Sequence, residues 1–269
     1  MSWWGKLAGG GLGFALGGPL GAMIGTILGH QLDKPSAGSR KQFRFNPGSQ
    51  ERTQAVFFTA TFSVMGHLAK ADGRVSPEEI KLAERVMQQM HLNNEQRKAA
   101  IELFYHGKGD EFVLDEVLDQ FRKECRRKIT LIQMFIEIQL QAVYADGEKH
   151  LEEDKILKYV CNKLGYPYAL VSQLESLILA QQRNYQQSGT TDSRSSAHVL
   201  KDAYRILGIS SSNSDSELKK SYRRLMSQHH PDKLISKGLP EEMIEIATDK
   251  TQEIQKAYDL ISKHRKSLH

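Results

Sequence analysis

Cysteine is nearly absent from this sequence of 269 residues, and its scarcity excludes whole classes of architecture. The two cysteines, Cys125 and Cys161, form no CxxC pair and have no spacing that suits a metal site. Both lie in stretches with apolar periodicity, so we predict that they are buried free thiols. A scaffold held by disulfides is therefore excluded, and a reducing compartment is favoured.

An excess of charge of one sign is also missing. Lys and Arg number 37 against 32 Asp and Glu, which gives a formal net charge of +5. Residues 51–187 carry 18 basic and 20 acidic side chains, and residues 198–269 carry 13 and 10. No segment is basic enough to predict a nucleic-acid partner. A nucleophile–base pair, a phosphate-binding loop and a constellation of metal ligands are absent too, so the sequence predicts neither an enzyme nor a bound cofactor or metal.

Residues 7–32 contain no charged side chain, and this gap predicts a transmembrane helix. At about 1.5 Å per residue, the segment spans about 39 Å, which exceeds a hydrocarbon core of about 30 Å. More Lys and Arg follow the segment than precede it, so the positive-inside rule places the C-terminal side in the cytoplasm. A cleaved signal peptide remains an alternative, with residues 35–38 as a weak candidate cleavage site. A flexible glycine-rich tail is another, because Pro19 interrupts the segment and glycine lowers its helix propensity.

Glycine recurs at every fourth position of this segment, from Gly5 to Gly29. Small residues at this spacing share one helix face and let two helix backbones approach closely within lipid. We therefore expect a homodimer through the membrane helix, in contact with membrane lipid elsewhere. The predicted dimerisation residues are Gly9, Gly13, Gly17, Gly21 and Gly25.

Residues 33–52 are rich in Pro, Gly, Ser and Arg and are predicted to be a juxtamembrane linker. From residue 53 to residue 187 the apolar periodicity is almost wholly helical, which predicts an all-α bundle of about seven helices. Ile129–Tyr144 is apolar nearly all round and is expected to be the central helix. Ile80, Ala83, Val86, Met87 and Met90 are expected to share one buried face.

A weak repeat lies within this bundle, because Ala71-Asp72-Gly73 and Ala145-Asp146-Gly147 each precede an acidic helix start, 74 residues apart. This pattern resembles the TerB-type helical domain of tellurite resistance. The carboxylates of Asp72 and Asp146 are the kind of ligand that a hard metal ion prefers. Asp-Gly is equally an ordinary turn, however, and acidic residues are favoured at helix N-termini by the helix dipole alone, so a metal site is not predicted.

The C-terminal residues predict a compact helical module after a polar linker at residues 188–199. A short helix ends at Gly208, and Ser214 with Glu217 forms a capping box that opens a helix running to about His229. Leu218, Tyr222, Leu225 and His229 fall on one stripe of this helix. The opposite face carries four cations, namely Lys219, Lys220, Arg223 and Arg224.

Pro231 is expected to end this helix and to leave His230, Pro231 and Asp232 in a loop. A last helix, beginning near Pro240 and Glu241, is expected to pack antiparallel on the basic helix. A metal site at His229, His230 and Asp232 is a weak alternative, because neighbouring residues do not share a helix face.

A basic helix, a His-Pro-Asp motif and a packing helix in this order resemble the J domain of DnaJ-type co-chaperones. The resemblance runs from Ala203-Tyr204-Arg205-Ile206-Leu207-Gly208 through Tyr222-Arg223-Arg224-Leu225 to Ile254-Gln255-Lys256-Ala257-Tyr258. It implies that the four cations steer the module onto a DnaK-type chaperone. It also implies that His230, Pro231 and Asp232 contact this chaperone and stimulate its ATPase. No Gly/Phe-rich segment and no CxxCxGxG repeat is present, so general substrate delivery of the DnaJ type is not expected.

The whole order resembles the DjlA family of inner-membrane DnaJ-like proteins. It implies a periplasmic N-terminus at residues 1–6, a transmembrane helix at 7–32, a bundle at 53–187 and a J domain at 200–269. The resemblance further implies a cytoplasm-facing regulatory co-chaperone in envelope or capsule regulation. The alternative is a membrane-anchored sensor or adaptor whose bundle binds a client or a metal and recruits the chaperone.

Overall fold

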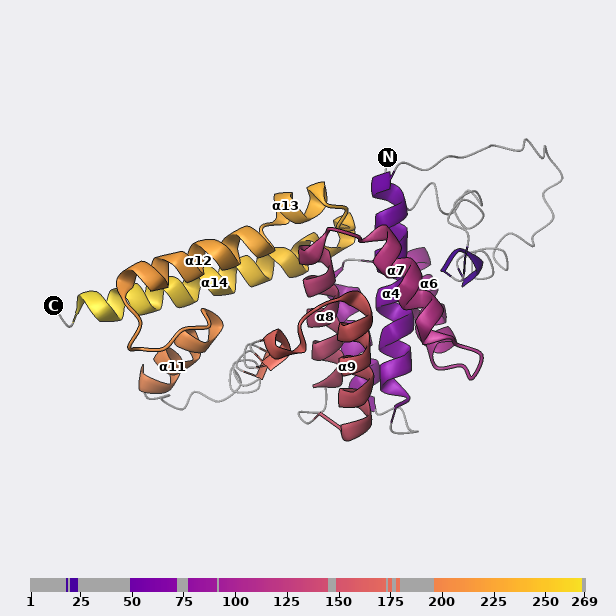
Figure 1. Ribbon diagram of the computed structural model, residues 1–269, viewed down its shortest axis with the longest axis horizontal. Coiled ribbons are helices and arrows are strands. Elements are labelled where there is room, and N and C mark those ends of the chain that lie inside the picture. Colours follow the sequence, from indigo (N-terminus) through magenta and orange to yellow (C-terminus); the bar gives the residue numbers. More distant parts are fainter. Residues whose placement is uncertain are drawn as a thin grey trace. The chain divides into compact units, whose positions relative to one another are not determined.

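A computed structural model describes residues 18, 20–23, 49–71, 77–90, 92–144, 149–172, 174–175, 178–179 and 196–267. Within these residues every regular element is a helix, which confirms the predicted all-α class (Figure 1). The chain divides into two compact units, each described here by itself. The first comprises the described part of Met1–Tyr166 with Lys237–Met243, and the second comprises Pro167–Ser236 with Ile244–His269.

The first unit is built around α4 (Ser49–Ala69), which packs against α6 (Asn94–Gly107), α7 (Leu114–Glu124) and α8 (Ile129–Val143). Helices α5 (Pro77–Gln89) and α9 (Leu151–Leu164) pack on α8, and α9 also contacts α7. A cluster of Phe57, Phe121 and Phe135 joins α4, α7 and α8, with ring centroids 4.5–6.2 Å apart. Within this unit, Gln54 Nε2 donates to the carbonyl oxygen of Leu239 at 3.3 Å.

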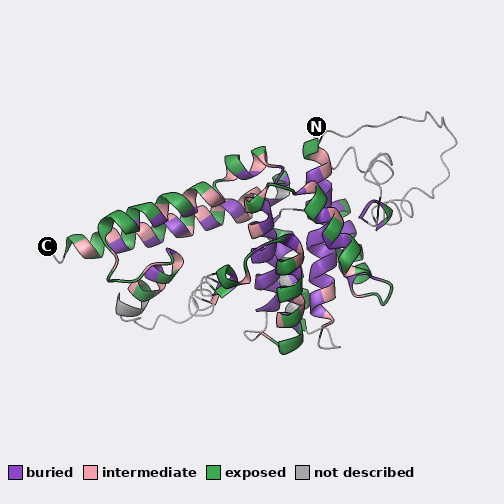
Figure 2. Cartoon of the chain, in the orientation of Figure 1, coloured by how far each residue is buried: buried purple, intermediate pink, exposed green. Residues whose placement is uncertain are grey.

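Helix α4 is buried along almost its whole length, although it contains several hydroxyl side chains (Figure 2). These hydroxyls are satisfied within the helix, since Thr59 donates to the carbonyl of Ala55, Thr61 to that of Phe57 and Ser63 to that of Thr59, at 2.7–2.8 Å. Such internal bonds remove most of the cost of burying a polar group. The prediction of a buried α8 is confirmed, but α4 shares the centre of the bundle with it.

Two glycines bring α4 and α6 into backbone contact. A Cβ atom on Gly66 would lie 2.0 Å from the carbonyl oxygen of Phe104, and one on Gly107 would lie 1.8 Å from that of Ser63. No side chain fits in either place, because real Cβ atoms do not approach a backbone oxygen so closely. The two helices therefore cross at a distance that only glycine permits.

Several predictions for the bundle hold, and two are wrong. Cys125 and Cys161 are buried free thiols, and burial raises the pKa of each to about 12. Ala83, Val86, Met87 and Met90 are buried as expected, but Ile80 on the same predicted face is 43% exposed. Ile129 is 61% exposed, because it starts α8 at a corner of the bundle rather than within it.

Residues of the predicted membrane span are described only at Gly18 and from Leu20 to Met23. The Leu20 backbone N–H donates to Gln120 Oε1 of α7 at 2.9 Å. Gly21 is buried, and the other predicted dimerisation residues, Gly9, Gly13, Gly17 and Gly25, lie outside the described residues. Across the described part of the chain, no helix combines the length and the apolarity that crossing a membrane requires.

The second unit contains α11 (Ser196–Ile206), α12 (Asp215–His229), α13 (Pro231–Ser236) and α14 (Ile244–Lys266). Helices α12 and α14 are antiparallel: Asp215 at the start of α12 pairs with Arg265 near the end of α14 at 2.7 Å. Midway along both helices, Tyr222 stacks on Tyr258 with centroids 4.3 Å apart. The core between α11, α12 and α14 consists of Ala203, Tyr204, Leu207, Leu218, Leu225, Ile254, Ala257 and Ile261.

Candidate functional site

The candidate site begins with a helix that presents one basic face. Ser214 starts α12 through the predicted capping box, since its hydroxyl accepts from the Glu217 N–H at 3.3 Å and its own N–H donates to Glu217 Oε2 at 2.7 Å. The Ser214 N–H and hydroxyl that donate to the Glu217 carboxylate hold the pKa of Glu217 below its usual range. The helix then buries one stripe against α11 and α14, namely Leu218, Ser221, Leu225 and His229.

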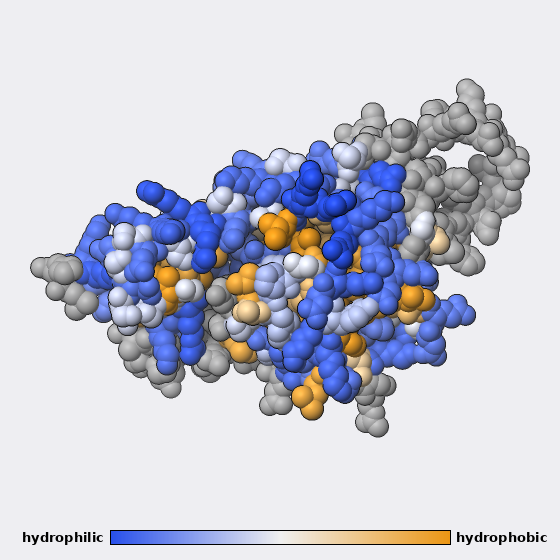
Figure 3. All heavy atoms as spheres, in the orientation of Figure 1, coloured by the Kyte–Doolittle hydropathy of each residue, from blue (hydrophilic) through white to orange (hydrophobic). Residues whose placement is uncertain are grey.

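The opposite face of α12 is exposed and carries Lys219, Lys220, Arg223 and Arg224, as predicted. No described carboxylate forms an ion pair with any of the four, although Arg224 Nη2 donates to Ser221 Oγ at 3.4 Å. Their positive charge is therefore not cancelled within the described residues. Figure 3 shows a strongly hydrophilic surface over this helix.

His230 ends α12 in an extended conformation, with φ −60° and ψ 123°. The cause is Pro231, whose ring disfavours helical geometry in the residue before it. The predicted loop is wrong in extent, however. Pro231 occupies the first position of α13, where a missing N–H costs nothing, so Asp232 lies in the first turn of a short helix.

The His230 side chain acts as the N-cap of α13. The Asp232 backbone N–H donates to His230 Nδ1 at 3.2 Å, so Nδ1 is an acceptor and the neutral ring carries its proton on Nε2. The Asp232 carboxylate is 87% exposed, and one of its oxygens lies 4.0 Å from Nδ1. Two different hydrogen-bonding groups, a ring N–H and a carboxylate, are thus presented side by side.

Three neighbouring contacts hold this turn in place. His229 before it and Leu234 after it are buried, at 4% and 1% exposure. Lys233 Nζ donates to Ser227 Oγ at 2.6 Å, which ties α13 back to the last turns of α12. Neither this contact nor the inward-facing Ser221, whose hydroxyl donates to the Leu207 carbonyl, was predicted from the sequence. The spacing of Ser221 from Leu218 and Leu225 was the available signal.

The far end of the second unit is fixed by Arg265. Its Nε donates to the Tyr204 hydroxyl at 3.1 Å, and its Nη1 pairs with Asp215. Its guanidinium also lies over the Tyr204 ring, 5.5 Å from the centroid. One side chain therefore joins α14 to α11 and to the start of α12, at the end of α12 opposite to the turn at His230.

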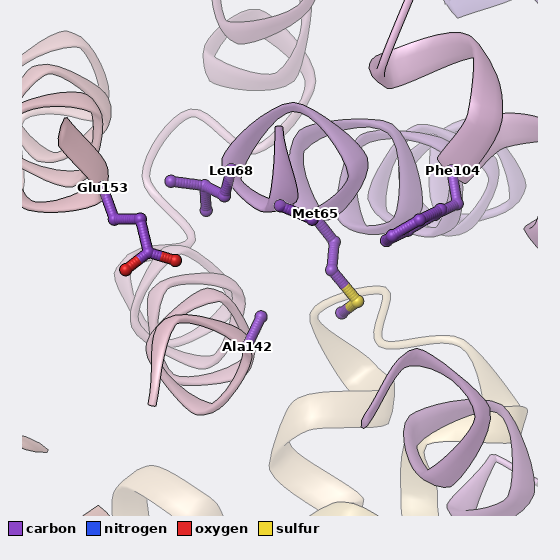
Figure 4. A pocket seen from close by; sticks show the side chains of 6 residues that line it. Met65, Leu68, Phe104, Ala142 and Glu153 are labelled. Carbon is purple, nitrogen blue, oxygen red and sulfur yellow. The ribbon is translucent and has the colours of Figure 1, made fainter. Parts of the chain in front are cut away.

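The core of the bundle contains a cavity that is too small for a ligand. A cavity of about 10 Å³ lies among Met65, Leu68, Phe104, Ala142 and Glu153 (Figure 4). This volume holds one water molecule at most. Glu153 is 4% exposed, and its Oε2 accepts the His150 backbone N–H at 2.8 Å, so its carboxylate already serves as a helix cap.

The metal hypothesis receives no support from the described residues. Asp72 and Asp146, the two acidic turns that suggested it, both lie outside them. Among the side chains that the structure places, no group of three or more His, Cys, Asp or Glu could hold a metal ion. The arrangement at His230 and Asp232 offers hydrogen-bonding groups and charge, which suit binding to a partner.

Three protein-family models match consecutive parts of the chain. They are the transmembrane domain of co-chaperone DjlA at residues 1–51, tellurite resistance protein TerB at residues 58–175 and the DnaJ domain at residues 202–268. No solved structure matches the chain.

Relatives named co-chaperone protein DjlA match almost the whole chain. The protein of Coxiella burnetii is 46% identical over 280 residues, covering 98% of this chain and 99% of its own length. That of Photobacterium profundum is 43% identical, with 97% and 99% covered, and that of Escherichia coli K12 is 40% identical, with 98% and 99% covered. The match therefore covers nearly the full length of this chain and of each relative.

Proposed function

Because the chain belongs to the DjlA family of co-chaperones, we propose that its J domain stimulates ATP hydrolysis by a DnaK-type chaperone while the N-terminal segment holds it in a membrane. One observation carries this proposal. The His230–Asp232 turn is exposed at the end of a helix whose basic face has no described ion-pair partner.

The basic face of α12 and the His230–Asp232 turn have different proposed roles in binding the chaperone. Lys219, Lys220, Arg223 and Arg224 provide long-range attraction toward an acidic surface of the chaperone. After encounter, the His230 Nε2–H donates to the chaperone and the Asp232 carboxylate accepts from it. Because α13 is capped by His230 itself, both groups arrive already oriented, and little entropy is lost on binding. The chain supplies binding energy, and the chaperone carries out the hydrolysis.

Asp232→Asn tests the turn. The substitution removes a charge from an 87% exposed side chain, so the fold should be unaffected, and stimulation of single-turnover ATP hydrolysis should be lost. Asp259→Asn is the matched control, because Asp259 is an exposed aspartate of α14 beside Tyr258, which stacks on Tyr222 midway along α12 and so lies away from the turn. Equal stimulation by the two variants would exclude a role for the Asp232 carboxylate.

The membrane that holds the chain and the orientation of the chain in it are also part of the proposal. We propose the inner membrane of a bacterial cell, with residues 1–6 in the periplasm and the bundle and J domain in the cytoplasm, on the basis of the Lys and Arg that follow residue 32. The role in envelope or capsule regulation rests on the family resemblance alone. So does a client-binding role for the bundle.

We further propose a homodimer through the glycines at four-residue spacing. Glycines at this spacing drift by about 40° per step around a helix of 3.6 residues per turn, so only the central part of the face can be in contact. Gly17→Leu should therefore leave the protein inserted but monomeric, since leucine is more apolar yet separates the backbones. Chemical crosslinking in membranes measures this, and a Gly17→Leu protein that still crosslinks as a dimer would exclude the glycine face.

A further inference from the structure

A second basic surface lies at the corner between α7 and α8. Seven consecutive residues, 122–128, contain five cations and one carboxylate, Glu124. Glu124 is already engaged, because its Oε1 pairs with Arg52 Nη2 at 2.7 Å. The exposed cations of this corner have no ion-pair partner among the described residues. They are Arg122, Lys123, Arg126 and Arg127.

The end of α7 explains why some of these cations are present, but not all of them. Basic residues in the last turn of a helix are favoured by its dipole, which accounts for Arg122 and Lys123. Arg126 and Arg127 lie beyond the helix, and Arg127 has φ +67°, a left-handed conformation that side chains other than glycine seldom adopt. Ile129, the next exposed residue, is 61% exposed. An exposed isoleucine beside clustered cations is typical of a surface that binds something both negative and apolar.

The position of this corner points to its partner. Lys128 Nζ donates to Thr53 Oγ1 at 2.7 Å, and Arg52 pairs with Glu124, so the corner is fastened to the first turns of α4. Helix α4 begins at Ser49, and the transmembrane family model extends to residue 51. From Leu32, the predicted end of the span, a fully extended chain reaches Ser49 within about 60 Å. The corner therefore lies at the end of the bundle that the membrane module leads into.

We propose that this corner, Arg122, Lys123, Arg126 and Arg127 with Ile129, binds the anionic headgroups of the membrane that holds the chain, with Ile129 entering the interface. The inference rests on the proposed membrane tether. Each cation near an anionic bilayer strengthens binding by about fivefold, so these exposed cations on a tethered domain suffice for stable contact. On the face drawn in Figure 3, deep blue atoms lie beside a small orange patch over the start of α8.

The test uses the full-length chain reconstituted into vesicles, with a polarity-sensitive fluorophore attached at Ile129→Cys. The native Cys125 and Cys161 are fully buried and their pKa values are near 12, so only the new thiol is labelled. Leu151→Cys is the matched control. It is 81% exposed at the start of α9, which follows the other end of α8.

In vesicles of phosphatidylcholine with phosphatidylglycerol, lipid-borne quenchers should quench the label at 129 and leave the label at 151 bright. In phosphatidylcholine alone, both labels should stay bright. Arg126→Gln with Arg127→Gln should lower the ratio of lipid-bound to unbound label about fivefold for each charge removed. Lys81→Gln with Lys98→Gln, which removes two exposed cations elsewhere on the bundle, should change nothing.

Several outcomes would overturn the proposal. Quenching at 129 that is the same with and without phosphatidylglycerol would show that the cations do not act on lipid. Loss of quenching when single-stranded RNA is added in small amount would assign the surface to nucleic acid instead. Extraction in alkaline carbonate distinguishes failure of the membrane tether from failure of the lipid contact. A chain that leaves the vesicles refutes the tether as well as the lipid contact. A chain that stays with its 129 label bright refutes the lipid contact alone.

Discussion

Helices α4 and α12 differ sharply in how much of their surface is buried. In α4, every residue from Thr53 to Gly66 is buried, whereas α12 buries only Leu218, Ser221, Leu225 and His229. The difference separates residues that stabilise the fold from residues that are exposed for binding. A substitution between Thr53 and Gly66 of α4 disturbs core packing, while most of α12 can change without loss of packing. The residues proposed to bind the chaperone therefore lie on a helix surface that contributes little to packing, whereas the buried part of α4 is sensitive to any change of side-chain volume.

The largest expected effect tests the closely packed side of this comparison. Gly107→Ala places a methyl group 1.8 Å from the Ser63 carbonyl oxygen, and backbone on both helices must move. We expect the free energy of unfolding to fall by about 3 kcal/mol or more, measured by thermal or urea unfolding followed by circular dichroism. Gly109→Ala is the control, since its methyl group would meet only the His106 carbonyl, at 3.1 Å. Equal losses in the two variants would contradict the close crossing of α4 and α6.

A smaller effect on stability is expected on the open face of α12. Arg223→Glu with Arg224→Glu should change the free energy of unfolding by no more than about 0.5 kcal/mol per site, because both side chains are exposed. Association with the chaperone should slow by about tenfold or more at low salt. Stopped-flow measurements against ionic strength check this, with Lys256→Glu and Lys263→Glu on α14 as the control. Because exposed charges are screened within about 8–10 Å at physiological salt, an association rate independent of salt would exclude steering.

Much of the second unit could be predicted from sequence, because its signals are local. Gly208 lies just after the end of α11 and has φ +61°, a conformation that glycine adopts without strain. The Ser214–Glu217 capping box starts α12 as predicted. Pro231 stopped α12 at the expected residue for a steric reason contained in two residues. That Asp232 belongs to a new helix was missed, because proline suits a first helical position as well as it ends the previous helix.

The bundle was harder to predict, because its determinants are contacts between distant residues. Nothing in the local sequence shows that Gly66 and Gly107 meet across two helices, or that the hydroxyls of α4 are satisfied within the helix. Ile80 matched the buried periodicity and is nevertheless exposed. The basic corner at residues 122–128 was missed for a different reason: charges counted over the whole of residues 51–187 cancel, while those of the corner do not.

The most direct test of the central claim compares fold and activity in the same variant. His230→Gln removes the Nδ1 cap of α13 and the outward Nε2–H, and it should cost at most about 1 kcal/mol of stability, the usual value of one N-cap. Stimulation of single-turnover ATP hydrolysis by a DnaK-type chaperone should nevertheless be abolished, while the exposed His264→Gln on α14 should stimulate as the unsubstituted chain does. A folded His230→Gln protein that stimulates hydrolysis at the unsubstituted rate would contradict the account.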